Sequence, residues 1–185
     1  MTFIFEGERI RLTVVSNDVL PQFAAWMSDF GLQRLVNPGM SVPHSEDDFL
    51  DPDGWFQGDL KNEKTRMFEV RTRSDDIFIG HCGIVNVNIF THSAEIGINL
   101  AHPDYRGKGY GGESMRLTMR YGFEQLNLNR IYLRVMSFNT RAIRLYEKLG
   151  FQQEAREREV LFHDGIYFDQ LLMGILRREW EAVNG

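Results

Sequence analysis

Cysteine is almost absent from this chain, since Cys82 is the only one among 185 residues. A single cysteine forms no internal disulfide, so the chain is not a disulfide-stapled scaffold. Long apolar runs are absent too, because no stretch approaches the roughly 20 residues that cross a bilayer. Residues 1–15 contain early acids and no small-residue cleavage site, which predicts that no signal peptide is present. We therefore expect a cytoplasmic protein that does not bind membranes.

Positive charge is in the minority, with 21 Lys and Arg residues against 26 Asp and Glu. This balance argues against a general nucleic-acid-binding protein. Apolar residues make up 43% of the chain and aromatic residues 12%, which is enough to form a core, so we expect residues 1–185 to form one domain. The charge is unevenly distributed: residues 106–148 carry nine bases and three acids, whereas residues 45–59 carry six acids and no base. This distribution predicts a polyanion site beside a surface that attracts cations.

The spacing of apolar residues predicts alternating strands and helices. We expect strands over 8–15, 66–72, 77–90, 94–100, 130–136, 153–162 and 166–176, and helices after Ser16 or Asn17, over about 111–126 and over about 140–149. Residues 30–64 are interrupted by prolines and glycines, so we expect loops there and one short helix near 55–60. This order predicts a single α/β (α+β) domain, with a mixed sheet and helices on both faces.

A glycine-rich turn at residues 105–112 (YRGKGYGG) lies between a predicted strand and a predicted helix. Backbone N–H groups there can approach a phosphate, and the helix N-terminus adds a partial positive charge. The turn formally matches G-x-G-x-x-G, but four residues separate it from the strand and no acid follows near 131–134. Lys108 precedes glycine rather than Ser or Thr, which excludes a Walker A loop. The remaining alternatives are another phosphate site and a plain connecting turn.

Two motifs in the chain resemble those of a known family. Residues 106–111 (RGKGYG) resemble the pyrophosphate loop R/Q-x-x-G-x-G/A of the GCN5-related N-acetyltransferases, and residues 139–151 (NTRAIRLYEKLGF) resemble that family's second signature. Residues 8–12 and 163–169 are similar to the branch that contains ribosomal-protein N-terminal acetyltransferases and bacterial spermidine acetyltransferases. The resemblance implies a mostly antiparallel mixed sheet with a splayed central strand pair. It also implies acetyl transfer from acetyl-CoA to a primary amine, by direct attack in a ternary complex.

The resemblance further implies which residues form the site. Tyr146 matches the family tyrosine that gives a proton to the departing thiolate, although its spacing also fits a packed aromatic residue. Glu95 begins the strand before the loop and is a candidate general base, directly or through water; an ion-pair partner or an exposed strand residue is the alternative. The residues expected to bind the cofactor are Ile98, Asn99, Leu100, Arg106, Gly107, Lys108, Gly109, Tyr110, Gly111, Gly112, Asn139 and Tyr146.

Three hypotheses concern the acceptor. The first is a small amine of the polyamine type, such as spermidine, whose ammonium groups would be held by the acids Glu46, Asp47, Asp48 and Asp51. The second is a protein N-terminus, such as that of a ribosomal protein. The third, from another class, is a CoA-binding module without catalysis.

Other residue types carry little signal for chemistry. Cys82 has no His–Asp pattern around it, so we expect a small buried strand residue rather than a nucleophile. The five histidines have no metal-ligand spacing, and we expect no metal cofactor. Strands left exposed in the resembling branch suggest a homo-oligomer.

Overall fold

The sheet in this computed structural model, which describes residues 3–36 and 45–184, contains eight strands in the order β1-β2-β3-β4-β5-β6-β8-β7. Every neighbouring pair is antiparallel except β5 and β6, which are parallel. The strands are β1 (Phe3–Glu6), β2 (Ile10–Val14), β3 (Arg66–Thr72), β4 (Phe78–Asn88), β5 (Ser93–Asn99), β6 (Arg130–Met136), β7 (Gln152–His163) and β8 (Ile166–Leu176).

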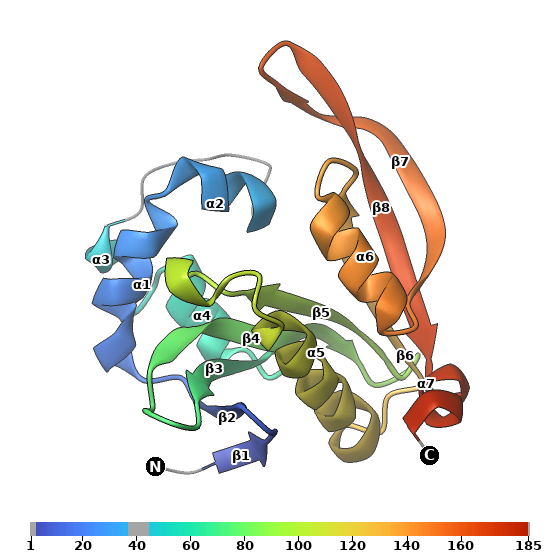
Figure 1. Cartoon of the computed structure of the whole chain (residues 1–185), viewed down its shortest axis with the longest axis horizontal. Helices are drawn as coiled ribbons and strands as arrows, with labels where there is room; N and C mark the ends of the chain where they lie inside the picture. The colour runs from blue at the N-terminus through green and yellow to red at the C-terminus, as the bar shows by residue number, and fades with distance from the viewer. Residues whose placement is uncertain (1–2, 37–44, 185) are drawn as a thin grey trace.

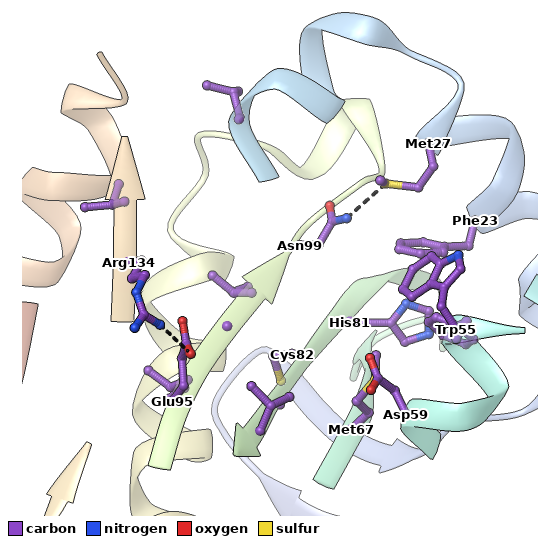
Figure 2. Close-up of a pocket in the computed structure, with 18 of the residues that line it drawn as sticks. Phe23, Met27, Trp55, Asp59, Met67, His81, Cys82, Glu95, Asn99 and Arg134 are labelled. Carbon is purple, nitrogen blue, oxygen red and sulfur yellow. Dashed lines mark hydrogen bonds and ion pairs between the residues drawn. The ribbon is translucent and has the colours of Figure 1, made fainter. Parts of the chain in front are cut away.

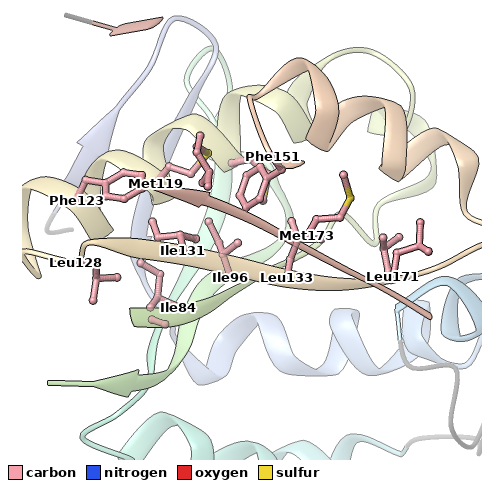
Figure 3. Packing of buried hydrophobic residues seen from close by; sticks show 14 residues of the cluster. Ile84, Ile96, Met119, Phe123, Leu128, Ile131, Leu133, Phe151, Leu171 and Met173 are labelled. Carbon is pink, nitrogen blue, oxygen red and sulfur yellow. The ribbon is translucent and has the colours of Figure 1, made fainter. Parts of the chain in front are cut away.

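Helices cover both faces of this sheet (Figure 1). They are η1 (Asn17–Val19), α1 (Leu20–Met27), α2 (Phe30–Val36), α3 (Glu46–Leu50), α4 (Trp55–Lys61), η2 (Pro103–Tyr105), α5 (Tyr110–Arg120), η3 (Tyr121–Gln125), α6 (Thr140–Lys148) and α7 (Arg177–Asn184). Helices α1–α4 form one apolar cluster with Phe78 of β4. On the other face, α5, η3 and the apolar side of α6 pack on the middle of the sheet, where Met119 and Phe123 meet Ile131 (Figure 3). The predicted fold class is confirmed.

The central strands separate soon after they meet. β5 and β6 pair only from Ser93 to Glu95 on one strand and from Arg130 to Tyr132 on the other. Beyond that point β5 stays paired with β4, while β6 pairs with β8 along its whole length. β5 therefore stays with β4 and β6 stays with β8, so a gap opens between β5 and β6. The backbone groups that face this gap are available to a ligand. The splayed strand pair expected from the family resemblance is present.

Residues 30–64 contain more helix than the sequence predicted. The described part of this segment holds α2 and α3 in addition to the expected short helix, α4, while residues 37–44 lie outside the described residues. α3 forms because the Ser45 side chain accepts a hydrogen bond from the Asp48 N–H, while the Asp48 carboxylate accepts one from the Ser45 N–H. β1 and α7 were not predicted either, and the helix after the glycine-rich turn ends as a π-helical turn, η3.

Candidate active site

The glycine-rich turn connects β5 to α5 through two residues with left-handed backbone. Gly107 has φ of 82° and Gly109 has φ of 90°, and Gly109 is the N-cap of α5. Glycine occupies these conformations without the steric cost that a Cβ atom brings. A Cβ at Gly112 would lie 3.2 Å from Leu145 Cδ1, so the turn also lets α5 approach α6 closely. The turn thus presents the N-terminus of an eleven-residue helix to a neighbouring cavity.

That cavity, called here the loop cavity, has a volume of about 680 Å³. It is bounded by the glycine-rich turn, the end of β5, α2 and α6. Nine of the twelve residues predicted to bind the cofactor line it: Ile98, Leu100, Arg106, Gly107, Gly109, Gly111, Gly112, Asn139 and Tyr146. Three bases of α6 that were not predicted also line it, namely Arg141, Arg144 and Lys148. Their i, i+3, i+7 spacing places them on one helix face, which was a signal available in the sequence.

Arg106 and Lys108 do not both turn their charges into this cavity. The Arg106 guanidinium donates hydrogen bonds to the backbone carbonyls of Leu100, at 3.2 Å, and Ala101. It therefore holds the end of β5 against the turn. Lys108 is exposed and outside the lining, and its carbonyl accepts a hydrogen bond from Arg9. Tyr110 also lies outside the lining, with its ring under the Arg9 guanidinium at 4.7 Å.

A second cavity of about 410 Å³, called here the sheet cavity, lies over β4 and β5 (Figure 2). Its floor includes the facing pairs His81 with Asn99 and Gly83 with Gly97. Helices α1 and α4 supply one wall, and β6 and α6 supply the other. The sheet and loop cavities share four lining residues, so they adjoin at the splay: Leu35, Ile98, Asn139 and Tyr146.

Asn139 and Tyr146 lie at opposite ends of α6: Asn139 is its N-cap, and Tyr146 lies in its last turn. The Asn139 side chain accepts a hydrogen bond from the Ala142 N–H at 3.2 Å and caps the helix. Tyr146 packs its ring 6.0 Å from that of Phe151, on the apolar face of the helix. Burial raises the pKa of the Tyr146 hydroxyl to about 12, because the phenolate would lose its hydration. The hydroxyl therefore stays protonated at neutral pH.

Glu95 lines the sheet cavity but is engaged by other residues. Its Oε2 atom lies 2.9 Å from Nη1 of Arg134 and accepts a hydrogen bond from Asn86 at 3.2 Å. Figure 2 shows Arg134 reaching Glu95 across the gap between β6 and β5. The ion-pair alternative weighed for this carboxylate is thus present in the structure.

The acidic segment divides into two parts. Glu46, Asp47, Asp48 and Asp51 are exposed, and they lie outside the described lining of the sheet cavity. The three acids of α3 occupy the first turn of that helix, where the helix dipole favours negative charge. From the same segment, Trp55, Phe56 and Asp59 do line the cavity. These three were not singled out in the sequence.

Asp59 differs from Glu95 in its electrostatic surroundings. Within the described part of the chain, its carboxylate has neither an ion-pair partner nor a hydrogen-bond partner. It lines the sheet cavity, as do Trp55 and Phe56 of the same helix, and Figure 2 shows it on the same side of the cavity as Trp55. A half-buried carboxylate among aromatic faces is a site that favours a cation.

Cys82 is buried on β4 and accepts a hydrogen bond from the Thr118 hydroxyl at 3.1 Å. Burial raises the pKa of its thiol to about 12, so the nucleophilic thiolate is not formed at neutral pH. Among residues 3–36 and 45–184, no group of three or more His, Cys, Asp or Glu side chains is placed to hold a metal ion. The described helices include none that is long and apolar enough to cross a membrane.

Comparisons with known proteins agree with this geometry. The family model for the GNAT acetyltransferase domain matches residues 9–152. An uncharacterized prophage-derived N-acetyltransferase of Bacillus subtilis (strain 168) is 33% identical over 132 residues, 71% of this chain and 72% of that protein. The spermidine N(1)-acetyltransferase of Escherichia coli (strain K12) is 31% identical over 134 residues, 72% of this chain and 70% of that enzyme.

Among solved structures, spermidine N-acetyltransferase from Vibrio cholerae in complex with CoA and spermine superposes with a TM-score of 0.83 at 25% identity. The match covers 93% of this chain and 98% of the other. The chain therefore belongs to the GNAT family and is an acetyl-CoA-dependent N-acetyltransferase.

Proposed function

We propose that this enzyme transfers the acetyl group of acetyl-CoA to a primary amine of a small, polyamine-like acceptor, by direct attack in a ternary complex. The observation that carries the proposal is the Asp59 carboxylate, which has no ion-pair or hydrogen-bond partner among the described residues and lines the same cavity as Trp55, Phe56 and Tyr146. The similarity to enzymes named as spermidine acetyltransferases supports the same class of acceptor.

The loop cavity fits the pyrophosphate and pantetheine parts of acetyl-CoA. The backbone N–H groups at the start of α5 are directed toward an anion, and Arg141, Arg144 and Lys148 supply full positive charges. The glycine-rich turn keeps this cavity open, because a Cβ at Gly107 would lie 3.3 Å from the Arg141 guanidinium. Beyond Glu95, β5 has no partner strand on its β6 side among the described residues, so the backbone groups on that edge are available for the pantetheine amides.

Tyr146 is the proposed general acid. As the amine nitrogen forms its bond to the thioester carbon, the carbon–sulfur bond breaks and the sulfur takes the hydroxyl proton of Tyr146. Because burial raises the pKa of this hydroxyl to about 12, it stays protonated at neutral pH and can hydrogen-bond and protonate the thiolate as that develops. Asn139 holds the start of α6 and borders both cavities, so it is placed to orient the pantetheine arm.

Asp59 and the surrounding rings are the proposed site for an ammonium group of the acceptor. A cation gains from the carboxylate and from the aromatic faces of Trp55 and Phe56. Trp55 is 55% exposed and lies at the mouth of the cavity, where a distal part of an extended amine would pass. Glu95, already paired with Arg134, is proposed to orient the β5 end of the cavity or a water molecule, rather than to hold the ammonium group.

The test compares spermidine-dependent release of CoA by the wild-type chain and by Asp59→Asn. One lost charge-assisted contact should raise KM for spermidine by about 10-fold or more, with kcat and the KM for acetyl-CoA changed little. Asp53→Asn, an exposed acid of the same segment outside the cavity, should behave as wild type. The acceptor assignment is wrong if spermidine is not acetylated, and turnover with a basic peptide N-terminus alone would favour the protein-acetylating alternative.

A further inference from the structure

His81 is a buried histidine with no assigned role. It lies on β4, is 3% exposed, and its ring makes edge contacts with Phe23, Phe78 and Phe56 at centroid distances of 4.4, 4.9 and 5.8 Å. Neither ring nitrogen has a hydrogen-bond partner among the described residues. Burial lowers the pKa of His81 to about 3, so the ring is neutral, with one N–H donor and one lone-pair nitrogen.

Asn99 lies directly opposite His81 in the register of β4 and β5. Its Nδ2 atom donates to the Met27 sulfur at 3.0 Å, while its Oδ1 atom is buried and lacks a partner within the described part of the chain. Both side chains line the sheet cavity, and Figure 2 shows the Met27 side chain beside Asn99. Two facing residues thus present three buried polar atoms whose hydrogen bonds are missing.

Unmet hydrogen bonds of this kind cost folding free energy, so a ligand that supplies the missing partners has a ready site. The site offers two acceptors, the lone-pair nitrogen of His81 and the Oδ1 atom of Asn99. Opposed residues of an antiparallel pair have Cβ atoms about 5 Å apart, so the two side chains leave the sheet from neighbouring positions on the same face. A neutral primary amine matches this site, because it has two N–H donors and one lone pair.

We propose that the reacting nitrogen of the acceptor binds between His81 and Asn99, donating one N–H to the imidazole nitrogen and the other to Asn99 Oδ1. The lone pair is then directed away from both residues, toward the thioester. This assignment rests on the proposed function and names the residues that hold its nucleophile.

Gly97 leaves open space between the proposed His81–Asn99 site and the gap where β5 and β6 separate. It lies on the same face of β5 as Asn99, and no atom lies within 4 Å of the position that a Cβ would take there. Tyr146 borders the same cavity from α6. The nucleophile and the general acid are therefore placed on opposite sides of the splayed strand.

The proton transfers of the proposed reaction require His81 to accept a proton only transiently, which a weakly basic imidazole can do. The acceptor loses its first proton to solvent before it binds as the neutral amine. When nitrogen bonds to the thioester carbon it becomes cationic and strongly acidic, and one N–H proton passes along its hydrogen bond to His81 and then to solvent. The carbon–sulfur bond breaks, sulfur takes its proton from Tyr146, and Tyr146 regains a proton from solvent before the next turnover.

The same geometry sets a specificity. A secondary amine has a single N–H group, so it satisfies only one of the two acceptors. The proposed site between His81 and Asn99 therefore selects primary amines. An N-methylated acceptor would leave one of these two residues without a hydrogen-bond donor.

The test uses the full-length chain with acetyl-CoA, 1,4-diaminobutane and its N,N′-dimethyl derivative. His81→Phe should lower kcat for the diamine by about 100-fold with little change in the KM for acetyl-CoA. Its Tm should equal or exceed that of wild type, because an apolar ring replaces unsatisfied polar atoms. Phe78→Leu, which disturbs the same aromatic cluster outside the cavity lining, should instead lower the Tm and keep kcat within a few-fold.

Asn99 gives an independent measurement at a second position. Asn99→Leu should lower kcat, whereas Asn99→Asp keeps an acceptor oxygen and should retain more activity than Asn99→Leu. The proposed amine-binding site is refuted if His81→Phe and Asn99→Leu both keep wild-type kcat. It is also refuted if wild type acetylates the dimethyl derivative with the same efficiency as the primary diamine. If wild type releases no CoA with any primary amine, the proposed function itself is wrong. If it acetylates primary amines but the variants keep wild-type kcat, only the His81–Asn99 site is wrong.

Discussion

Tyr146 combines two roles on one side chain. Its ring packs beside Phe151 as part of the apolar face of α6, and the residue also borders both cavities at the splay. The spacing of apolar residues in α6 predicted the packing, while only the family motif predicted the proton transfer. The structure accommodates both, because a phenol can bury its ring and still present its hydroxyl to a cavity.

Replacing Tyr146 by Phe removes the proposed acid and keeps the packed ring. We expect kcat to fall by about 100-fold while the KM for acetyl-CoA changes less than about 2-fold, since the thiolate then leaves without a proton donor. Wild-type kcat should not decline between pH 8 and 10, because the pKa of Tyr146 is about 12. Steady-state kinetics over this pH range checks both statements.

Tyr167→Phe is the matched control, because it removes a phenol hydroxyl from the exposed β7–β8 hairpin. Turnover of Tyr146→Phe within a few-fold of wild type would show that another group protonates the sulfur.

Helix α6 is positioned by its two ends. Asn139 caps its start, and at its end the Phe151 N–H donates to the Tyr146 carbonyl while the Gly150 N–H donates to that of Glu147. This pair of bonds is the Schellman motif, which requires left-handed backbone at Gly150, where φ is 93°. The helix thereby brings Tyr146 to the splay and its basic face to the loop cavity.

Gly150→Ala should destabilise the fold by about 1–2 kcal/mol, because the left-handed conformation is unfavourable for alanine. A Cβ there would also lie 3.1 Å from Ile175 Cδ1. Urea unfolding measures the change in the free energy of unfolding. Gly165 has φ of 79°, and no atom lies within 4 Å of the position that a Cβ would take there, so Gly165→Ala isolates the backbone strain.

If the two alanine variants lose equal stability, crowding against Ile175 contributes nothing. A Gly150→Ala variant as stable as wild type would contradict the strain argument itself.

In the folded molecule, the basic and acidic stretches of the sequence lie at different places around the two cavities. The basic stretch 106–148 includes the glycine-rich turn and α6, which together surround the loop cavity. Three of the six acids of 45–59 lie in the first turn of α3, and Asp59 of the same segment lines the sheet cavity. The cationic groups thus surround the loop cavity, whereas the Asp59 carboxylate, which has no partner among the described residues, lines the sheet cavity.

Whole-molecule stability should depend on pH through His81. Its pKa falls from 6.5 to about 3 on folding, so between these values the unfolded chain binds a proton that the folded chain excludes. The His81 contribution is therefore complete above about pH 6.5 and is lost as the pH falls, by up to about 1.4 kcal/mol per pH unit.

Between pH 7 and 4.5 the free energy of unfolding of wild type should fall by about 2–3 kcal/mol more than that of His81→Phe. Urea unfolding of both proteins at several pH values provides the comparison, and the difference removes the contribution of the other titrating groups. Parallel pH dependences would mean that His81 is protonated in the folded protein.

The sequence was informative wherever function lies in contiguous residues. The glycine-rich turn and residues 139–151 are local features, and the helices predicted there, over about 111–126 and about 140–149, agree closely with the observed α5 with η3 and with α6. Residues 30–64 were harder, because α2–α4 are short and form largely by packing Phe49 and Phe56 into a shared cluster. The roles proposed for Glu95 and the acids of α3 had no such local basis.

The sequence by itself determined the fold family, the glycine-rich turn and the place of the tyrosine on α6, because each is specified by contiguous residues. Only the tertiary structure decided which acid and which histidine reach the cavity. Strict alternation along β4 would place Phe78 and His81 on opposite faces. A bulge at Ile79–Gly80, opposite Val70 and Arg71, places them on the same face with rings 4.9 Å apart. The site thus depends on strand pairing between distant segments, which no local pattern specifies.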